Sequence, residues 1–199
     1  MRVSRSKSGL ASRPGRRRGG DVTDREAIRL SDGISAQVPD WSRERKALLE
    51  WNPSRALLAS IRNYQHHRAG RGIFSAVARI LAVLQHRLWS VITGADVPLV
   101  CRIGGGLLMP HPNGIVIHPD AVIGPNCLLM QQVTIGTRNS KPPVIGGHAD
   151  IGAGAKILGA VKIGDHAKIG ANALVIHDVP DFGVAMAPLA VIRAAKQAD

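Results

Sequence analysis

Residues 145–175 read IGGHAD-IGAGAK-ILGAVK-IGDHAK-IGANAL-V, so an aliphatic residue opens a new unit at every sixth position. Residues 117–136 show the same six-residue period, beginning at Ile117. The fifth position of each unit is small or β-branched, and the second position is usually Gly. Self-similarity at a short constant period is typical of a solenoid, in which each turn of the chain packs on the next.

A period of six predicts a parallel β-helix in which three short strands complete one triangular coil. We expect the opening aliphatic residue to point inward and to stack on its equivalent one coil away. The small fifth residue would also face the interior, close to a corner. Glycine at the second position would adopt backbone angles that are forbidden to other residues. A narrow prism has no room for rings, and no aromatic residue occurs from Ala95 to Asp181.

The six-residue period is interrupted at two places. The step 109–117 between core positions is eight residues long, and the step 135–145 is ten residues long. The extra residues must leave the prism as loops, and loops on a rigid scaffold often carry function. The first loop contains His111, and the second spans residues 137–144.

The chain before the repeats has helical patterning. We expect a short helix from Ser42 to about Glu50, a second helix beginning at Pro53, and a third from about Ile73 to Thr93. The third has a broad apolar face that must pack on the other helices, the following domain or a neighbouring subunit. The expected organisation is a disordered basic tail (1–40), a helical segment (41–94), a β-helix domain (95–182) and a C-terminal tail (183–199).

Charge is concentrated in the first half of the chain. The formal net charge is +12, and residues 1–94, with 18 Lys/Arg and 7 Asp/Glu, hold +11 of it. The basic residues at the N-terminus have no aromatic residues among them, so we expect a solvated tail and no specific nucleic-acid partner. Two cysteines, Cys101 and Cys127, are too few for a disulfide framework or a four-ligand zinc site.

Long apolar segments are also missing from the sequence. No stretch of about 20 residues is purely apolar, which argues against a membrane span. The basic N-terminus is not followed by the apolar segment of a secretory signal. We therefore expect a cytoplasmic protein.

The hexapeptides resemble those of the left-handed β-helix acyltransferases, and residues 96–136 are most similar to the serine O-acetyltransferase family. The residues that carry the resemblance are MPHPNGIVI around His111, Asp96 fifteen residues earlier, QQVTIG (131–136) and IGAGAKILG (151–159). The resemblance implies a left-handed parallel β-helix and transfer of an acetyl group from acetyl-CoA to L-serine, giving O-acetylserine for cysteine biosynthesis. Acetyl-CoA would be a co-substrate, with no permanently bound cofactor and no metal.

The same resemblance implies roles for individual residues. His111 would be the general base, since imidazole titrates near neutral pH. Asp96 would accept a hydrogen bond from its other ring nitrogen and so determine the tautomer. His118 is the alternative base. The expected CoA-binding residues are Gly136, Ala153, Lys168 and Ala171, and the expected substrate-binding residues are Lys141 and Arg138.

The chain departs from the family pattern around the acceptor. Pro110 stands where the family has an Asp before the catalytic His, and Lys141-Pro142 stands where it has Arg-His. Two alternatives therefore stay open: O-acetylation of a sugar hydroxyl in polysaccharide biosynthesis, and a non-catalytic β-helix scaffold. The resemblance also implies a homotrimer, or a dimer of trimers, with sites between neighbouring prisms and cysteine synthase as a candidate partner.

Overall fold

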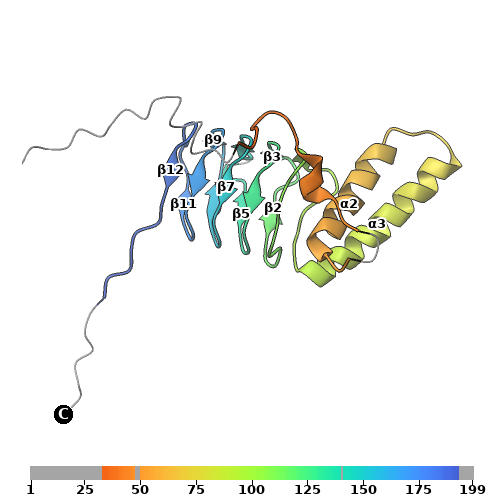
Figure 1. Ribbon diagram of the computed structural model, residues 1–199, viewed down its shortest axis with the longest axis horizontal. Coiled ribbons are helices and arrows are strands. Elements are labelled where there is room, and N and C mark those ends of the chain that lie inside the picture. The colour runs from red at the N-terminus through yellow and green to blue at the C-terminus, as the bar shows by residue number, and fades with distance from the viewer. Residues whose placement is uncertain (1–32, 48–49, 140, 193–199) are drawn as a thin grey trace, which may run out of the picture.

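The computed structural model describes residues 33–47, 50–139 and 141–192, and over these ranges two helices precede a stack of short strands (Figure 1). The helical elements are a 3₁₀ turn η1 (Trp41–Glu44), α2 (Pro53–His67) and α3 (Ile73–Thr93). The strands are β1 (Arg102–Ile103), β2 (Val116–Ile117), β3 (Val122–Ile123), β4 (Leu128–Leu129), β5 (Thr134–Gly136), β6 (Val144–Ile145), β7 (Asp150–Ile151), β8 (Lys156–Leu158), β9 (Lys162–Ile163), β10 (Lys168–Ile169), β11 (Leu174–Val175) and β12 (Val184–Ala185).

The strands form three parallel sheets, each with four strands. The orders are β11-β8-β5-β2, β1-β3-β6-β9 and β12-β10-β7-β4, which we call the first, second and third sheets. The chain visits them in rotation. Isolated bridges at Asp96, Leu108 and Val179 add a fifth level to each sheet, so the solenoid has about five coils. The predicted parallel β-helix is confirmed, and the helices lie at its first coil (Figure 1).

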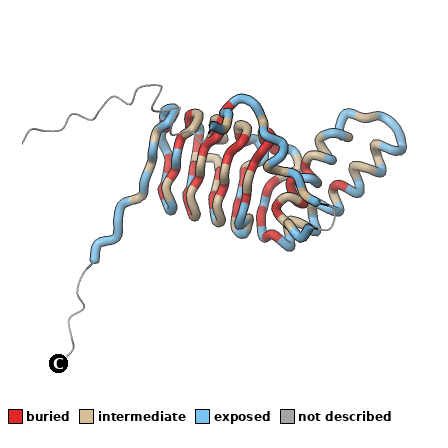
Figure 2. The backbone as a smooth tube through the Cα atoms, viewed as in Figure 1, coloured by how far each residue is buried: buried red, intermediate tan, exposed pale blue. Residues whose placement is uncertain are grey.

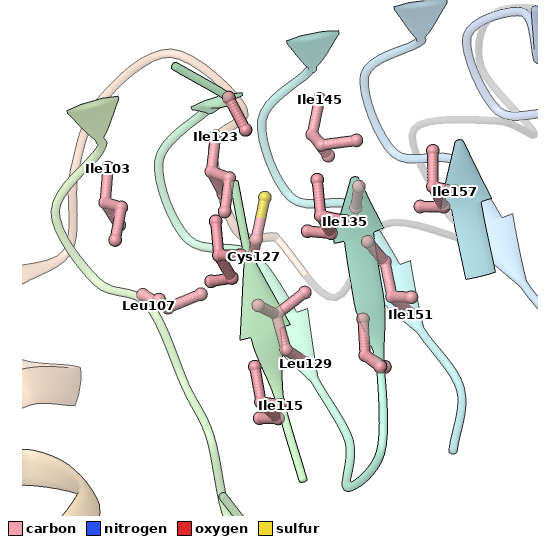
Figure 3. Packing of buried hydrophobic residues seen from close by; sticks show 14 of the residues in the cluster. Ile103, Leu107, Ile115, Ile123, Cys127, Leu129, Ile135, Ile145, Ile151 and Ile157 are labelled. Atoms are coloured by element: carbon pink, nitrogen blue, oxygen red, sulfur yellow. The ribbon is translucent and has the colours of Figure 1, made fainter. Parts of the chain in front are cut away.

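The core is a set of aliphatic columns that run along the axis of the β-helix. Parallel pairing places Ile135 beside Ile117 on one side and Ile157 on the other, all in register. Each of the three is at most 2% exposed, and Figure 3 shows Ile135 and Ile157 pointing into the prism. The fifth residues of the units, such as Ala121 and Ala155, are buried beside them, as expected. Figure 2 shows the resulting bands of buried backbone.

Glycine at the second position is needed for a reason other than the one expected. None of these glycines in the described residues has a left-handed φ; instead, a Cβ on Gly124 would lie 2.6 Å from the backbone carbon of Gly146 in the next coil. The left-handed residues occupy the fourth position, for example Asn126 (φ 60°), His148 (φ 50°) and His166 (φ 58°). At second positions such as Gly124 and Gly146, close approach of successive coils, and not backbone freedom, excludes a side chain.

The helices begin and end largely where the sequence predicts. Asn52 caps α2, its side-chain oxygen accepting from the backbone N–H of Arg55, with Pro53 in the first turn. Gly94 ends α3 in a left-handed conformation, φ 65°. The expected helix from Ser42 to Glu50 is wrong over the described residues: the helical element there is the 3₁₀ turn η1, and Asp40 caps it by accepting from the Ser42 N–H.

A salt-bridged arginine attaches the helices to the first coil. The Arg62 guanidinium donates to both carboxylate oxygens of Glu44, at 2.8 and 3.1 Å. It also donates to the carbonyls of Ile103 (2.6 Å) and Gly104 (2.7 Å), and it lies over the ring of Trp41. One side chain therefore joins α2, η1 and the β-helix.

Two of the expected boundaries differ from the structure. Residues 33–40, expected within the disordered tail, lie on the β-helix: Ala36 is buried, and the Asn126 amide donates to the carbonyls of Ser35 (2.7 Å) and Val38 (2.8 Å). The rest of that expected tail, residues 1–32, lies outside the described residues. At the other end β12 pairs with β10, so the β-helix continues past residue 182. Over the described ranges, no helix is both long and apolar enough to cross a membrane.

Candidate functional site

His111 lies on the turn that connects the third sheet to the first, between the first and second coils. The turn starts after the bridge residue Leu108 and ends at β2, and its extra residues form the predicted bulge. His111 is exposed and flanked by Pro110 and Pro112, whose rings restrict the backbone on both sides. The imidazole is therefore presented to solvent from a stiff segment.

The segment that carries Asp96 runs beside the strand that follows His111. Asp96 bridges to Val116, its N–H donates to the Ile115 carbonyl at 2.8 Å, and its carbonyl accepts from Ile117 at 2.9 Å. The side chains of Asp96 and His111 are both exposed, and no hydrogen bond or ion pair in the described part of the chain joins them. The pairing of Asp96 with His111 therefore remains a prediction. The two residues belong to backbone segments that lie side by side.

The turns between the third and first sheets stack into a ladder above the His111 bulge. The Asn113 carbonyl accepts from Gln132, the Gln131 carbonyl from Gly154, and the Ala153 carbonyl from Asn172, all at 2.8–2.9 Å. The equivalent positions are Asn113, Gln131, Ala153 and Ala171. The structure thus brings two of the expected CoA-binding residues, Ala153 and Ala171, to the edge that carries His111.

Lys168 lies at the same edge. It is an exposed residue of β10, the strand that leads directly into the turn at Ala171. The edge therefore offers an imidazole at one end, small side chains along its length and an ammonium group near the other end. Such an arrangement suits a long ligand with an anionic terminus, because small residues let the backbone approach the ligand closely.

Gln131 is a candidate site residue that the sequence argument did not single out. Its Oε1 is buried and has no hydrogen-bond partner in the described residues. It occupies the rung between Asn113 and Ala153, next to the His111 bulge. A buried acceptor without a partner is costly, which makes Gln131 a candidate site residue. Its position as the first residue of the QQVTIG motif is the sequence signal that could have identified it.

The second loop lies at the opposite edge of the first sheet. Gly136 ends β5 beside Leu158, and the chain then leaves the prism. Arg138 and Lys141 form an antiparallel bridge across this loop, and both are exposed. Within one chain, the first sheet separates Arg138 and Lys141 from His111, so a single subunit does not gather all the predicted site residues.

His118, the alternative base, has a local partner. Its Nδ1 accepts from the Asp120 backbone N–H at 3.2 Å, and the Asp120 carboxylate lies 3.9 Å away. It follows β2 at the edge near Gly136, away from the ladder above His111. The geometry favours His111 as the residue presented beside the ladder.

The two cysteines are buried in the prism and are free. Burial raises the pKa of each thiol to about 12, and the nearby Asp96 carboxylate adds to the effect at Cys101. Neither thiol is a nucleophile at neutral pH. In the described ranges, no three His, Cys, Asp or Glu side chains come together as a metal site would require.

Comparison with known proteins places the chain among transferases. A family model for the bacterial transferase hexapeptide (six repeats) matches residues 142–177. Serine acetyltransferase 5 of Arabidopsis thaliana is 40% identical over 126 residues, which are 61% of this chain and 40% of the relative. The serine acetyltransferase of Synechococcus elongatus is 32% identical over 118 residues, 57% of this chain and 48% of the relative. The chain spans about half the length of these curated relatives, or less.

A solved structure gives the same result. The soybean serine acetyltransferase complexed with serine superimposes with a TM-score of 0.55 at 33% identity, covering 68% of this chain and 54% of the soybean chain. Both the fold and the repeats are therefore similar to those of serine acetyltransferases.

Proposed function

The chain belongs to the serine acetyltransferase family of hexapeptide-repeat transferases, and from this premise we propose that it transfers the acetyl group of acetyl-CoA to an alcohol, with L-serine as the first candidate acceptor. The observation that carries the proposal is the edge of the β-helix that joins His111 to the ladder of Ala153 and Ala171. It combines a solvent-accessible base with a row of stacked turns along which an extended ligand could lie.

In this mechanism His111 acts as the general base. The imidazole takes the proton of the acceptor hydroxyl as the oxygen attacks the thioester carbonyl carbon. When the tetrahedral intermediate collapses, the C–S bond breaks and the protonated imidazole returns its proton to the CoA sulfur. Asp96, on the adjacent backbone segment, would orient the ring and stabilise its protonated form.

Acetyl-CoA would lie along the ladder, and Lys168 would contact its phosphate groups. A related solved structure, a serine acetyltransferase in complex with CoA, supports this co-substrate, with a TM-score of 0.56 at 29% identity. The small side chains of Ala153 and Ala171 would let the pantetheine arm approach the backbone of their two turns. Gly136 lies at the far edge of the sheet and would contribute only from a neighbouring chain.

We propose that the complete site forms between chains of a homotrimer. The separation of Arg138 and Lys141 from His111 across the first sheet supports this assembly, because their loop can meet the His111 edge of a second prism. In a cytoplasmic enzyme of cysteine biosynthesis, cysteine synthase would be a natural partner.

Two prolines bear on the choice of acceptor. Pro110 and Pro142 occupy positions where the family resemblance implies an Asp and a His that hold the amino acid, and proline has no side-chain hydrogen bond to offer. Each lost charge-assisted contact is worth roughly 1.5–3 kcal/mol. We therefore expect L-serine to be used with a high KM. The same two positions favour a sugar hydroxyl as the second candidate acceptor.

Thiol release from acetyl-CoA tests the proposal, with L-serine and a panel of monosaccharides and disaccharides as acceptors. We expect turnover with L-serine, and a further rise in KM when Lys141 is replaced by Ala, because the ammonium group would pair with the carboxylate. Lys162→Ala, an exposed lysine of β9, is the matched control. Release with a sugar and none with L-serine would replace serine by a sugar as the acceptor. No release with any acceptor would favour the scaffold alternative.

A further inference from the structure

The outer face of α3 is a continuous apolar stripe that nothing in the described structure covers. Its exposed residues include Ile73, Val77, Ile80, Leu84, Leu88 and Val91. At 100° per residue, these six fall within an arc of about 80° and extend over about 27 Å of helix. Phe74 beside them is 89% exposed. Ala82 and Thr93, the buried residues of α3, lie on the opposite side of the helix.

The hairpin of α2 and α3 carries only positive charge. Residues 51–95 contain six arginines and no Asp or Glu. Two of the arginines, Arg55 and Arg62, have carboxylate partners in the preceding segment. The remaining four have no carboxylate within salt-bridge distance in the described residues.

Three of these four arginines surround a hollow between the helices. The hollow has a volume of about 370 Å³, and Arg68, Arg79 and Arg87 line it together with Ile80 and Leu84 of the apolar stripe. Cationic groups therefore lie directly beside exposed aliphatic side chains. This pairing fits a ligand that is anionic at one end and apolar at the other.

We propose that the α2–α3 hairpin docks on an anionic phospholipid surface, with the apolar stripe in the acyl boundary and Arg68, Arg79 and Arg87 against lipid phosphates. A second copy of the hairpin would match the stripe but would oppose arginines to arginines, because the hairpin has no acid to pair with them. An amphipathic helix with a basic border lies in the plane of the membrane interface. The inference does not depend on the proposed acetyl transfer.

The position of the hairpin permits such docking. It projects from the first-coil end of the β-helix, whereas residues 33–40 lie against later coils (Figure 1). The His111 turn lies at the C-terminal end of α3, where the Gly114 N–H donates to the Gly94 carbonyl at 2.9 Å, so docking would bring the candidate site close to the lipid surface. The enzyme would then act as a peripheral protein at a lipid surface.

Vesicle co-sedimentation of the full chain tests the proposal. We expect binding to vesicles of phosphatidylglycerol and phosphatidylcholine, and at least tenfold weaker binding to phosphatidylcholine alone. The variant I80Q/L84Q/L88Q should lose at least tenfold in binding to the anionic vesicles. The matched control L174Q/V184Q/M186Q, three exposed apolar residues of the β-helix end, should bind like the wild type. Thermal unfolding followed by circular dichroism would establish that both variants are folded.

A labelling experiment avoids replacing the stripe and remains informative if the triple variant is unstable. Since Cys101 and Cys127 are buried, a single Leu84→Cys can be labelled with an environment-sensitive dye, with Leu174→Cys as the control. Anionic vesicles should shift the emission of the dye at position 84 to the blue and leave that at position 174 unchanged.

Three results would overturn the proposal. The first is wild-type protein that does not sediment with anionic vesicles. The second is a triple variant that binds as well as the wild type with no dye shift at position 84, which would assign binding to the basic residues 1–32. The third is a combination of two results: vesicles leave the dye signal unchanged, and light scattering gives the triple variant a lower oligomeric mass than the wild type. That combination would show that the stripe binds a second copy of the chain.

Discussion

Replacing Arg62 by Ala should weaken the attachment of the helices to the β-helix at a large cost in stability. The guanidinium is 20% exposed and its partner Glu44 is 9% exposed, so the ion pair is mostly removed from water. The substitution leaves the Glu44 carboxylate without its cation and the carbonyls of Ile103 and Gly104 without their side-chain donor. Breaking a buried pair by removing one partner costs about 3–5 kcal/mol.

Equilibrium urea unfolding measures this loss, with wild type and variants at the same protein concentration because the proposed assembly would contribute to stability. Arg55→Ala is the matched control, since its guanidinium lies 3.6 Å from Glu50 in a solvent-exposed pair. The control should unfold close to the wild type. The reasoning fails if Arg62→Ala loses no more unfolding free energy than Arg55→Ala.

Three further predictions concern the site and the boundaries. Asp96→Asn should lower kcat by less than the loss of His111 does and should change the pH–rate profile; an unchanged profile would argue against the Asp–His pair. Cys101 and Cys127 should react with a thiol reagent only as the protein unfolds, because burial raises the pKa of both thiols; rapid reaction of the native protein would contradict their placement. Deleting residues 1–40 should lower the melting temperature relative to deleting 1–32, since only the longer deletion removes the carbonyls that the Asn126 amide binds; equal melting temperatures would show that the contact is not stabilising.

The repeat made the fold predictable because each six-residue unit is a local signal of inside and outside. Every opening aliphatic residue from Ile117 to Val175 is buried where the period places it. Pro53 and Gly94 similarly marked helix ends, because each has a backbone conformation of its own. These features depend on neighbours in sequence or on a strict period.

Contacts between distant segments left no such signal. Residues 33–40 have no periodicity, and they are held by one amide side chain, Asn126, together with a bond from Gln37 to Asp165. The fourth-position residues form another such set. His148 and His166 lie 2.9 Å apart through their Nδ1 atoms, and the His166 ring stacks on Phe182 at 4.8 Å. In the sequence, these two histidines sit at a variable position of the repeat.

The candidate site could be predicted only in part, because the six-residue period determines the positions of some of its residues and not of others. The period puts Ala153 and Ala171 on equivalent turns, so their alignment follows from the repeat alone. The relation of Arg138 and Lys141 to His111 depends on which edges of the prism their loops leave and on how prisms assemble. No pattern within one chain encodes that arrangement.

Steady-state turnover of His111→Ala tests the central claim most directly. With acetyl-CoA and the best acceptor, we expect a loss of about 10²–10⁴-fold in kcat, the usual effect of removing a general base. The melting temperature should stay at the wild-type value because the side chain is exposed and makes no hydrogen bond in the described structure. His118→Ala, the matched control, should keep most of its turnover. A His111→Ala enzyme with more than half the wild-type turnover would contradict the assignment of His111 as the base and of the adjacent ladder as the acetyl-CoA site.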